Sequence, residues 1–359
     1  MGKRELGLIL AFVVAGVIVW QVTAPRAEGP GFSLGNWLSE TRREIRGRRA
    51  SAEVTTAPAI PIDSSINGLR LTLSGEVTIK GEDRADIASE LRVVSNGFDE
   101  AEAKKLAGDL RLTVSRFADS VVVGWERPEP GRQQPTLILR VPSRLRIQLE
   151  GRGTAEVTGV ESVTLARQTG RLKLASILGS VSGESRGGVT VDGAEMVDLS
   201  IAGNQTTIRG VRGEVRLNVR SGEVRLEQVA GRLMLSGTDM RVRVDGAEGE
   251  VRAEIADGEL ELNDVSAPVD IDARGTPVTI GWLRAAPAKV QVRDDGLELV
   301  LPKDADSYSL DVRATRGELR VPERLHKTTE GEDTIVTKTA RANAPSIFVR
   351  GVGASITIR

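Results

Sequence analysis

The stretch GEVRLNVRSGEVRLE at residues 213–227 contains two short runs in which aliphatic side chains alternate with polar or charged ones. Such alternation predicts a β-strand with one buried face. Both runs recur at steps of eighteen residues, so that Val215 is followed by Leu233 and then by Val251. A unit this short cannot bury its apolar face alone and must stack on copies of itself. The repeat therefore predicts an all-β solenoid with two strands in each coil.

The repeat continues towards the N-terminus with a step of seventeen residues, beginning near Leu145. The change of step leaves the inward faces in phase, because the extra residue falls in a turn. About eight coils fit between residues 145 and 280, which at ~4.8 Å per stacked strand gives a rod of about 35–40 Å. We therefore expect a single-stranded β-solenoid, or β-helix, with coils of roughly eighteen residues.

An eighteen-residue coil can also be built from three hexapeptides, as in a left-handed β-helix. That arrangement would turn Glu223, Arg241 and Glu259 inwards along one of its three faces. Burying charges without partners costs several kcal/mol for each group. The charge pattern therefore favours two strands per coil.

The sequence divides into five sections. These are a transmembrane anchor (1–25), a basic juxtamembrane segment with a proline-containing linker (26–65), an α+β capping section (66–142), the solenoid repeats (143–322) and closing strands (323–359). The capping section contains one predicted helix, from Asp99 to Ala107, in which Asp99 caps the start and Gly108 ends the helix. A cap of this kind protects the end strands from pairing with other molecules.

The N-terminal section is apolar. Residues 6–24 follow Lys3 and Arg4 and approach the roughly 20 residues that cross a bilayer core. The basic residues predict a cytoplasmic N-terminus, with a single-pass anchor in the bacterial inner membrane and a periplasmic or extracellular body. A signal peptide cleaved after Ala24 is the alternative. Residues 32–49 then have helical spacing with many arginines, which suits either a helix on the lipid surface or a solvated stalk.

Composition excludes several functions. The chain has 49 basic and 50 acidic residues, so no net field recruits nucleic acid. It has no cysteine and a single histidine, His326, which argues against a zinc site. We expect no metal and no cofactor.

Carboxylates at Glu223, Glu259, Asp257 and Asp245 suggest the acid and base of a polysaccharide-cleaving β-helix. Such a pair needs surroundings that separate the two pKa values. Here arginines alternate with the carboxylates, as in the row formed by Glu223, Arg241 and Glu259. Neighbours of opposite charge stabilise a sheet, so we expect no catalytic residues and a structural role for these rows.

Five arginines at outward positions form the predicted binding surface. They are Arg216, Arg225, Arg241, Arg243 and Arg252. Their spacing follows the repeat, which would place them along the outside of the rod.

Glycine-punctuated units such as LTLSGEVTIKG at residues 71–81, together with the unit at residues 213–227, resemble the bacterial putative-adhesin family of β-strand-repeat proteins. The resemblance extends from about residue 66 to residue 322. It implies an envelope-associated protein, often membrane-anchored, without established catalytic residues. We therefore expect a non-catalytic, adhesin-like binding or scaffold protein that contacts the bilayer through residues 6–24 and an unknown envelope protein or glycan. A structural or regulatory subunit of an envelope-stress complex is the alternative function.

Overall fold

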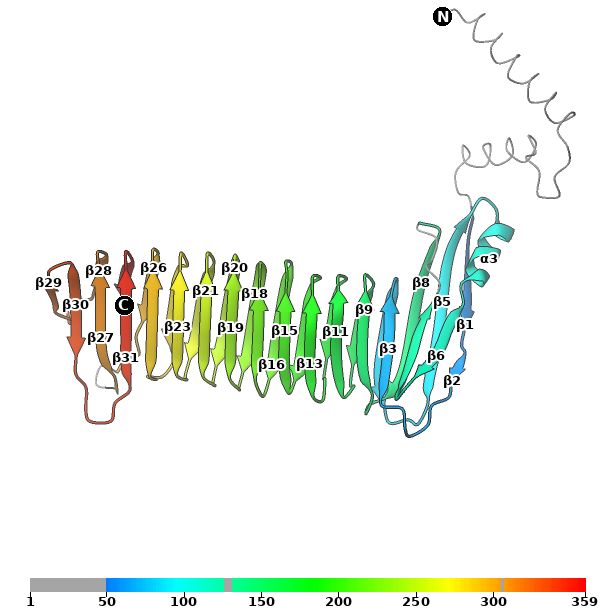
Figure 1. Ribbon diagram of the computed structural model, residues 1–359, viewed down its shortest axis with the longest axis horizontal. Helices are drawn as coiled ribbons and strands as arrows, with labels where there is room; N and C mark the ends of the chain where they lie inside the picture. The colour runs from blue at the N-terminus through cyan, green and yellow to red at the C-terminus, as the bar shows by residue number, and fades with distance from the viewer. Residues whose placement is uncertain (1–49, 126–130, 305–306) are drawn as a thin grey trace, which may run out of the picture. The chain divides into compact units, whose positions relative to one another are not determined.

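The computed structural model describes residues 50–125, 131–304 and 307–359. Within it, Ser51–Arg359 forms one compact unit (Figure 1). None of the helices in these described ranges has the length and apolar character that a membrane span requires. The expected anchor at residues 6–24 and the amphipathic segment at 32–49 lie outside the described residues.

Two long sheets face each other along the unit. The first, called sheet A, has the stacking order β1 (Ala50–Thr56), β5 (Ile87–Gly97), β8 (Gln133–Pro142), β4 (Glu76–Glu82), β10 (Thr154–Thr158), β12 (Leu172–Ala175), β14 (Val189–Ala194), β16 (Gln205–Val211), β18 (Gly222–Val229), β20 (Met240–Ala247), β22 (Glu259–Val265), β24 (Val278–Trp282), β26 (Gly296–Val300), β32 (Ser355–Ile358) and β28 (Glu318–Arg320). The short β2 (Ala59–Ile60) also pairs with β5.

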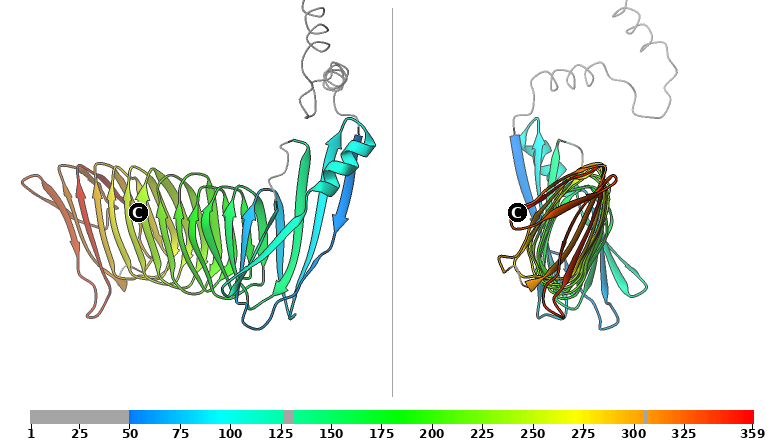
Figure 2. Two further views of the ribbon diagram at one scale, coloured as in Figure 1. Left: turned by 45° about the vertical axis from the view of Figure 1, so that its right-hand side comes forward. Right: turned by 90° about the vertical axis from the view of Figure 1, so that its left-hand side faces the viewer.

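The second sheet, called sheet B, has a matching order. It comprises β29 (Lys327–Glu330), β30 (Asp333–Lys338), β27 (Ser309–Thr315), β31 (Ser346–Val352), β25 (Ala288–Arg293), β23 (Val269–Arg274), β21 (Val251–Ala256), β19 (Leu233–Thr238), β17 (Val215–Val219), β15 (Met196–Ile201), β13 (Ser180–Ser185), β11 (Ser162–Gln168), β9 (Arg146–Gly151), β3 (Gly68–Leu73), β7 (Ser120–Trp125) and β6 (Leu112–Phe117). Successive strands of the chain alternate between the sheets from β9 to β26, which confirms two strands per coil (Figure 2).

The core lies between the sheets and consists of aliphatic columns. Val215, Leu233 and Val251 are register partners in neighbouring strands, and each is fully buried. Glu223 and Arg241, which a hexapeptide helix would bury, are instead exposed on sheet A. The eighteen-residue step therefore sets one residue of each coil directly above its equivalent in the next coil.

Glycine at the turn between the sheets permits this close stacking. A Cβ atom placed on Gly231 would overlap the backbone carbonyl of Gly213 in the coil below, and one on Gly249 would overlap the carbonyl of Gly231. Any side chain at these positions would force the coils apart.

Thr206 is one of several buried polar residues and lies in an otherwise aliphatic column. Thr206 is register partner to Val189 and Val224 and is fully buried, yet its Oγ1 has no hydrogen-bond partner. A buried hydroxyl without a partner is destabilising because it has given up its bonds to water.

The N-terminal end departs from the chain order. The coil formed by β3 and β4 lies between β7–β8 on its outer side and β9–β10 on its inner side. Beyond β7 and β8 the pairing becomes antiparallel, with β6 on β7 and β5 on β8. Among the described strands, sheet A then adds one more, β1, whereas sheet B ends at β6.

The expected helix is present as α3 (Glu100–Asp109), which packs on β5. Asp99 caps it by accepting a hydrogen bond of 2.8 Å from the Glu102 amide, and the Glu102 carboxylate accepts one from the amide of Phe98. The expectation that Gly108 ends the helix was wrong. Gly108 lies inside α3, and the chain leaves the helix at Leu110 in an extended conformation rather than through a left-handed glycine.

The C-terminal end is also permuted. Strands β31 and β32 insert between β25–β26 and β27–β28, so the coil that is last in the chain is not the last in the stack. The hairpin β29–β30 then covers the outer edge of β27 through antiparallel pairing.

Candidate functional site

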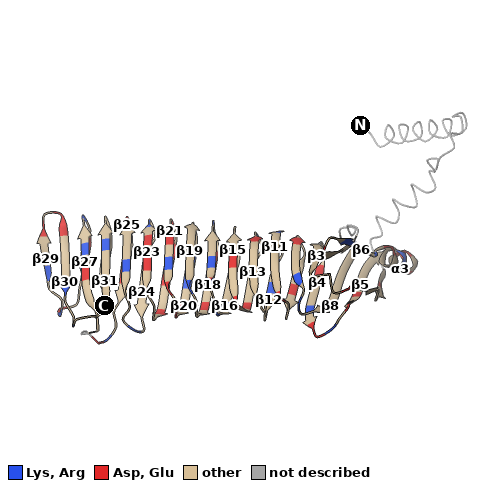
Figure 3. Cartoon of the chain, turned by 60° about the horizontal axis from the view of Figure 1, so that its bottom comes forward, with Lys and Arg blue, Asp and Glu red and all other residues tan. Residues whose placement is uncertain are grey.

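The outer face of sheet A carries three parallel rows of polar side chains across β16, β18, β20 and β22. We call these twelve positions the charged face: Gln205, Thr207, Arg209, Glu223, Arg225, Glu227, Arg241, Arg243, Asp245, Glu259, Glu261 and Asn263. They face outwards because their neighbours in each strand occupy the buried columns. Positive and negative segments also alternate along the strands of sheet B, which face the viewer in Figure 3.

Ion pairs link the rows of the charged face. Arg225 contacts Glu227 at 2.6 Å and Asp245 at 3.7 Å. Arg243 in turn contacts Asp245 at 3.0 Å and Glu261 at 3.3 Å. The result is a continuous network that crosses three strands, in which each guanidinium lies between two carboxylates.

Asp245 is the centre of this network. Its partial burial alone would raise its pKa, but hydrogen bonds from Asn263 and Arg243 and the charges of Arg243 and Arg225 outweigh that effect and hold the pKa below its usual value. Asp245 is therefore ionised at neutral pH and serves as an acceptor for its neighbours.

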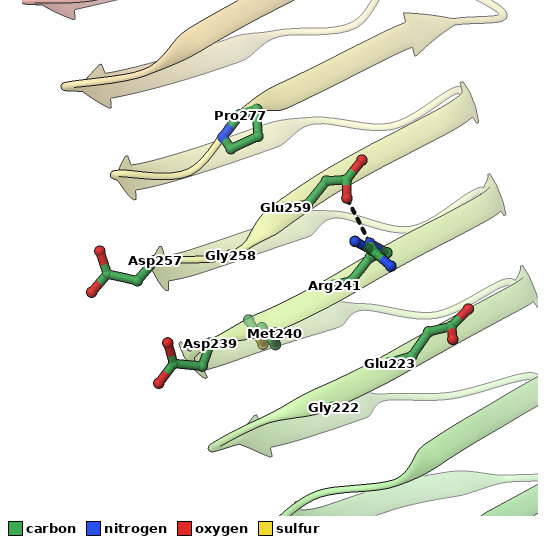
Figure 4. Close-up of a pocket in the computed structure, with 9 residues that line it drawn as sticks. All are labelled: Gly222, Glu223, Asp239, Met240, Arg241, Asp257, Gly258, Glu259 and Pro277. Atoms are coloured by element: carbon green, nitrogen blue, oxygen red, sulfur yellow. Dashed lines mark hydrogen bonds and ion pairs between the residues drawn. The ribbon is translucent and has the colours of Figure 1, made fainter.

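A shallow groove of about 480 Å³ lies at one margin of the charged face (Figure 4). Arg241 lies between Glu223 and Glu259 there and donates to the Glu259 carboxylate at 2.6 Å. Asp239 and Asp257 belong to the neighbouring turns and point away from that row in Figure 4.

The carboxylates considered as an acid–base pair are thus divided. Glu223, Glu259 and Asp257 line the groove, whereas Asp245 belongs to the ion-pair network. Glu223 and Glu259 both neighbour the same guanidinium, so their surroundings do not differ in the way that a general acid and a general base require. Within the described ranges, no group of three or more acidic or histidine side chains is arranged to hold a metal ion.

The predicted binding surface is split between two faces. Arg225, Arg241 and Arg243 lie on sheet A, but Arg216 and Arg252 lie on the outside of sheet B, where Met234 stands between them in register.

Each of the two sheet B arginines has an acidic partner, Arg216 with Glu214 at 2.7 Å and Arg252 with Glu254 at 3.7 Å. The sequence repeat identified outward positions correctly. The two strands of each coil belong to opposite sheets, so Arg216 and Arg225 lie on different faces although they are close in the sequence.

Sequence reasoning missed the third row of the charged face, formed by Arg209, Glu227, Asp245 and Asn263. The signal was present, since these residues also recur at eighteen-residue steps. The third row completes the network because Asn263 donates to Asp245 at 3.0 Å and to Glu261 at 2.9 Å.

The fold and the paired charges define a two-sheet β-solenoid with ion-paired outer faces. The family model described as Toastrack DUF4097 matches residues 66–349, and the chain belongs to this family. Among curated proteins, none matches the chain.

Several solved structures are similar to this chain at low identity. A putative lipid binding protein from Parabacteroides distasonis is 10% identical over 86% of this chain and 96% of its own, with a TM-score of 0.37. A putative adhesin from the same organism is 12% identical over 67% of this chain and 92% of its own, with a TM-score of 0.30. A putative cell adhesion protein from Clostridium sporogenes is 9% identical over 86% and 99%, with a TM-score of 0.20. With TM-scores this low, these structures support no inference about ligands.

Proposed function

We propose that this protein is a non-catalytic, adhesin-like binding protein of the bacterial envelope. Residues 6–24 anchor it in the inner membrane, and the solenoid holds a polar partner against its outer faces. The observation that carries the proposal is the charged face, where guanidinium and carboxylate groups are fixed by one another in rows.

The chemistry of the charged face favours a neutral, hydroxyl-rich partner such as an envelope glycan. Its twelve positions hold four arginines and five acidic residues, so the face has almost no net charge. Donors and acceptors instead alternate at the strand spacing of ~4.8 Å. Side chains that are already held in place lose little conformational entropy on binding.

A structural or regulatory subunit of an envelope complex is the second candidate. Family membership supports both functions equally, because the Toastrack family has no assigned activity. The two functions differ in the partner, which is a glycan for an adhesin-like protein and one fixed protein for a subunit.

Photo-crosslinking in the native membrane separates the two functions. Photo-reactive residues are placed at 225, 243 and 261, which are register neighbours on the charged face, and in a second set at 216, 234 and 252 on sheet B. Adducts that contain glycan support the adhesin-like function, and one dominant protein adduct supports the subunit.

The matched control is a set of inward positions, 224, 242 and 260, which are buried and must give no adduct in the folded protein. Outer-face positions that give no more adduct than these would contradict a binding function for both faces.

A further inference from the structure

The N-terminal end of the solenoid lacks one strand. In sheet A, β5 is the second strand beyond β4, and in sheet B, β6 is the second strand beyond β3. Strands β5 and β6 therefore occupy the same layer of the stack. Sheet A then continues with β1, while no described strand continues sheet B beyond β6. The position beside β6 that would face β1 is therefore vacant in the described part of the chain.

The vacant position is an apolar groove of about 690 Å³. Val54 of β1 and Val93 of β5 form one side, and Leu110 and Leu112 form the other. Val93 and Leu110 belong to the buried core, and Val54 and Leu112 are half-buried against it. The groove is thus the open end of the core.

The vacant position leaves an inward-facing side chain of β6 exposed to solvent. Val114 lies opposite the buried Val123 in the β6–β7 pair and so faces inwards, yet it is 44% exposed. Equivalent inward residues within the stack, such as Val121 on β7, are fully buried. An inward aliphatic residue with this exposure lacks the neighbour that a further strand would supply.

The backbone of β6 is also available for pairing. The β6–β7 hairpin has a two-residue loop between the paired residues Phe117 and Ser120. In such a turn, the two paired residues exchange backbone hydrogen bonds. Along an antiparallel pair, residues that bond to the partner strand then alternate with residues whose backbone N–H and C=O groups point to the other side. It follows that the N–H and C=O groups of Leu112, Val114 and Arg116 point to the free edge.

The ends of the groove are defined. Ala107 and Gly108 of α3 line one end. Towards the C-terminal end of β6, the Arg116 side chain reaches the connection between β2 and β3, where it contacts Asp63 at 3.2 Å and the carbonyl of Pro61 at 2.8 Å.

A second copy of the same end does not fit the groove. If β6 paired with β6 of another copy, the β5 strand of that copy would have to lie directly beside β5 in sheet A. That place is already taken by β1, so the two copies would clash. The occupant is therefore a single strand rather than a symmetric partner.

We propose that this groove binds an extended, acidic peptide segment of another protein, which adds a strand to the free edge of β6. Backbone pairing supplies affinity, and alternate apolar side chains of the peptide fill the groove. Charge specifies the acidic residue, because Arg111 is the one charged side chain lining the groove, is exposed, and forms no ion pair with any described residue. The site is separate from the charged face and does not depend on the glycan proposal.

Binding is measured with the full chain in detergent and a fluorescein-labelled peptide of sequence Glu-Glu-Val-Thr-Val-Thr-Val. Fluorescence anisotropy gives the affinity, and hydrogen exchange gives the site. We expect saturable binding, slower exchange of the amides of residues 112–117, and at least tenfold weaker binding of the peptide Lys-Lys-Val-Thr-Val-Thr-Val. Failure of the acidic peptide to bind, or binding without protection of β6, would overturn the proposal. The proposal would also be overturned if oleate bound in the groove and the acidic peptide did not.

Three variants localise the effect. Val114→Pro removes an edge N–H and should weaken peptide binding at least tenfold, while proline is tolerated on an edge strand. The matched control is Thr329→Pro on β29, the edge at the other end of sheet B, which should leave binding unchanged.

Gly108→Trp fills the groove from a position where an added Cβ meets nothing within 4 Å, so it should block binding without unfolding the chain. Wild-type affinity in both Val114→Pro and Gly108→Trp would refute the site, and circular dichroism confirms that each variant is folded.

Discussion

In the middle of the solenoid each strand has a parallel neighbour on both sides, whereas at the N-terminal end β1 and β6 each have a described neighbour on one side only. Leu217 and Leu226 in the middle are fully buried, but Val114 in β6 is 44% exposed although it also faces inwards. The same alternating sequence therefore buries its apolar face only where another coil covers it. Burial in this fold is a property of the stack, and an incomplete stack leaves a surface that can bind.

The largest expected effect tests how tightly the middle is stacked. Gly231→Ala places a methyl group against the backbone carbonyl of Gly213 in the coil below. We expect the free energy of unfolding to fall by about 1–3 kcal/mol, as for other overpacked sites. Urea unfolding followed by circular dichroism measures the change. A midpoint that does not move would show that the coils can separate at this turn without cost.

A smaller effect of opposite sign is expected at Thr206. Thr206→Val keeps the shape of the side chain and removes a buried hydroxyl that has no partner. The free energy of unfolding should rise by about 1–2 kcal/mol. Thr207→Val is the matched control, because the neighbouring Thr207 faces outwards and the same change there should be nearly neutral. Destabilisation by Thr206→Val would mean that a water molecule satisfies the hydroxyl.

At the N-terminal end an added methyl group should stabilise the protein. Gly108 lies within α3, and a Cβ there meets nothing within 4 Å, in contrast to Gly231. Alanine favours a helix over glycine, so Gly108→Ala should raise the free energy of unfolding by about 0.5–1 kcal/mol. The control is Gly97→Ala, where the new Cβ would contact the backbone of Asp99 and Ala103 closely and should destabilise. Thermal unfolding of the two variants should therefore shift in opposite directions.

The smallest effect concerns the charged face and depends on pH. The folded pKa of Asp245 is lowered, so its contribution to stability is present above the unfolded value of about 4 and is lost as the pH falls through the folded value. Asp245→Asn should cost about 0.5–1 kcal/mol at pH 7 and progressively less as the pH falls below about 4.

Asp270→Asn on sheet B removes a carboxylate that has no ion pair with any described residue, so it serves as the control. Urea midpoints between pH 2 and pH 7 measure both variants. If the difference in urea midpoint between Asp245→Asn and the wild type is the same at every pH, the prediction is wrong.

The middle of the fold could be predicted from sequence because its determinants are local and periodic. Val215, Leu233 and Val251 recur at the same step that sets them in one column. The capping residue Asp99 and its partner Glu102 could also be recognised in the sequence, because both lie at the first turn of the helix.

The ends could not be predicted in this way, because chain order does not give stacking order. Ile347 and Ile356 have the same alternation whether their coil lies at the tip or one level inside it, and only the pairing with β25 and β26 distinguishes the two. The vacancy beside β6 likewise depends on the number of strands in each sheet. The charged face was predicted in part, from Glu223, Arg241 and Glu259, because its rows repeat but their ion pairs depend on side-chain conformation.

The insertion of β31–β32 beneath β27–β28 has a consequence for biosynthesis. A ribosome produces β27 and β28 before the coil that separates them from β25 and β26, so the solenoid cannot grow one coil at a time behind the emerging chain. The nascent chain must either leave β27–β28 undocked or dock it early and displace it. The strands at this end are therefore assembled in an order that differs from their order in the chain.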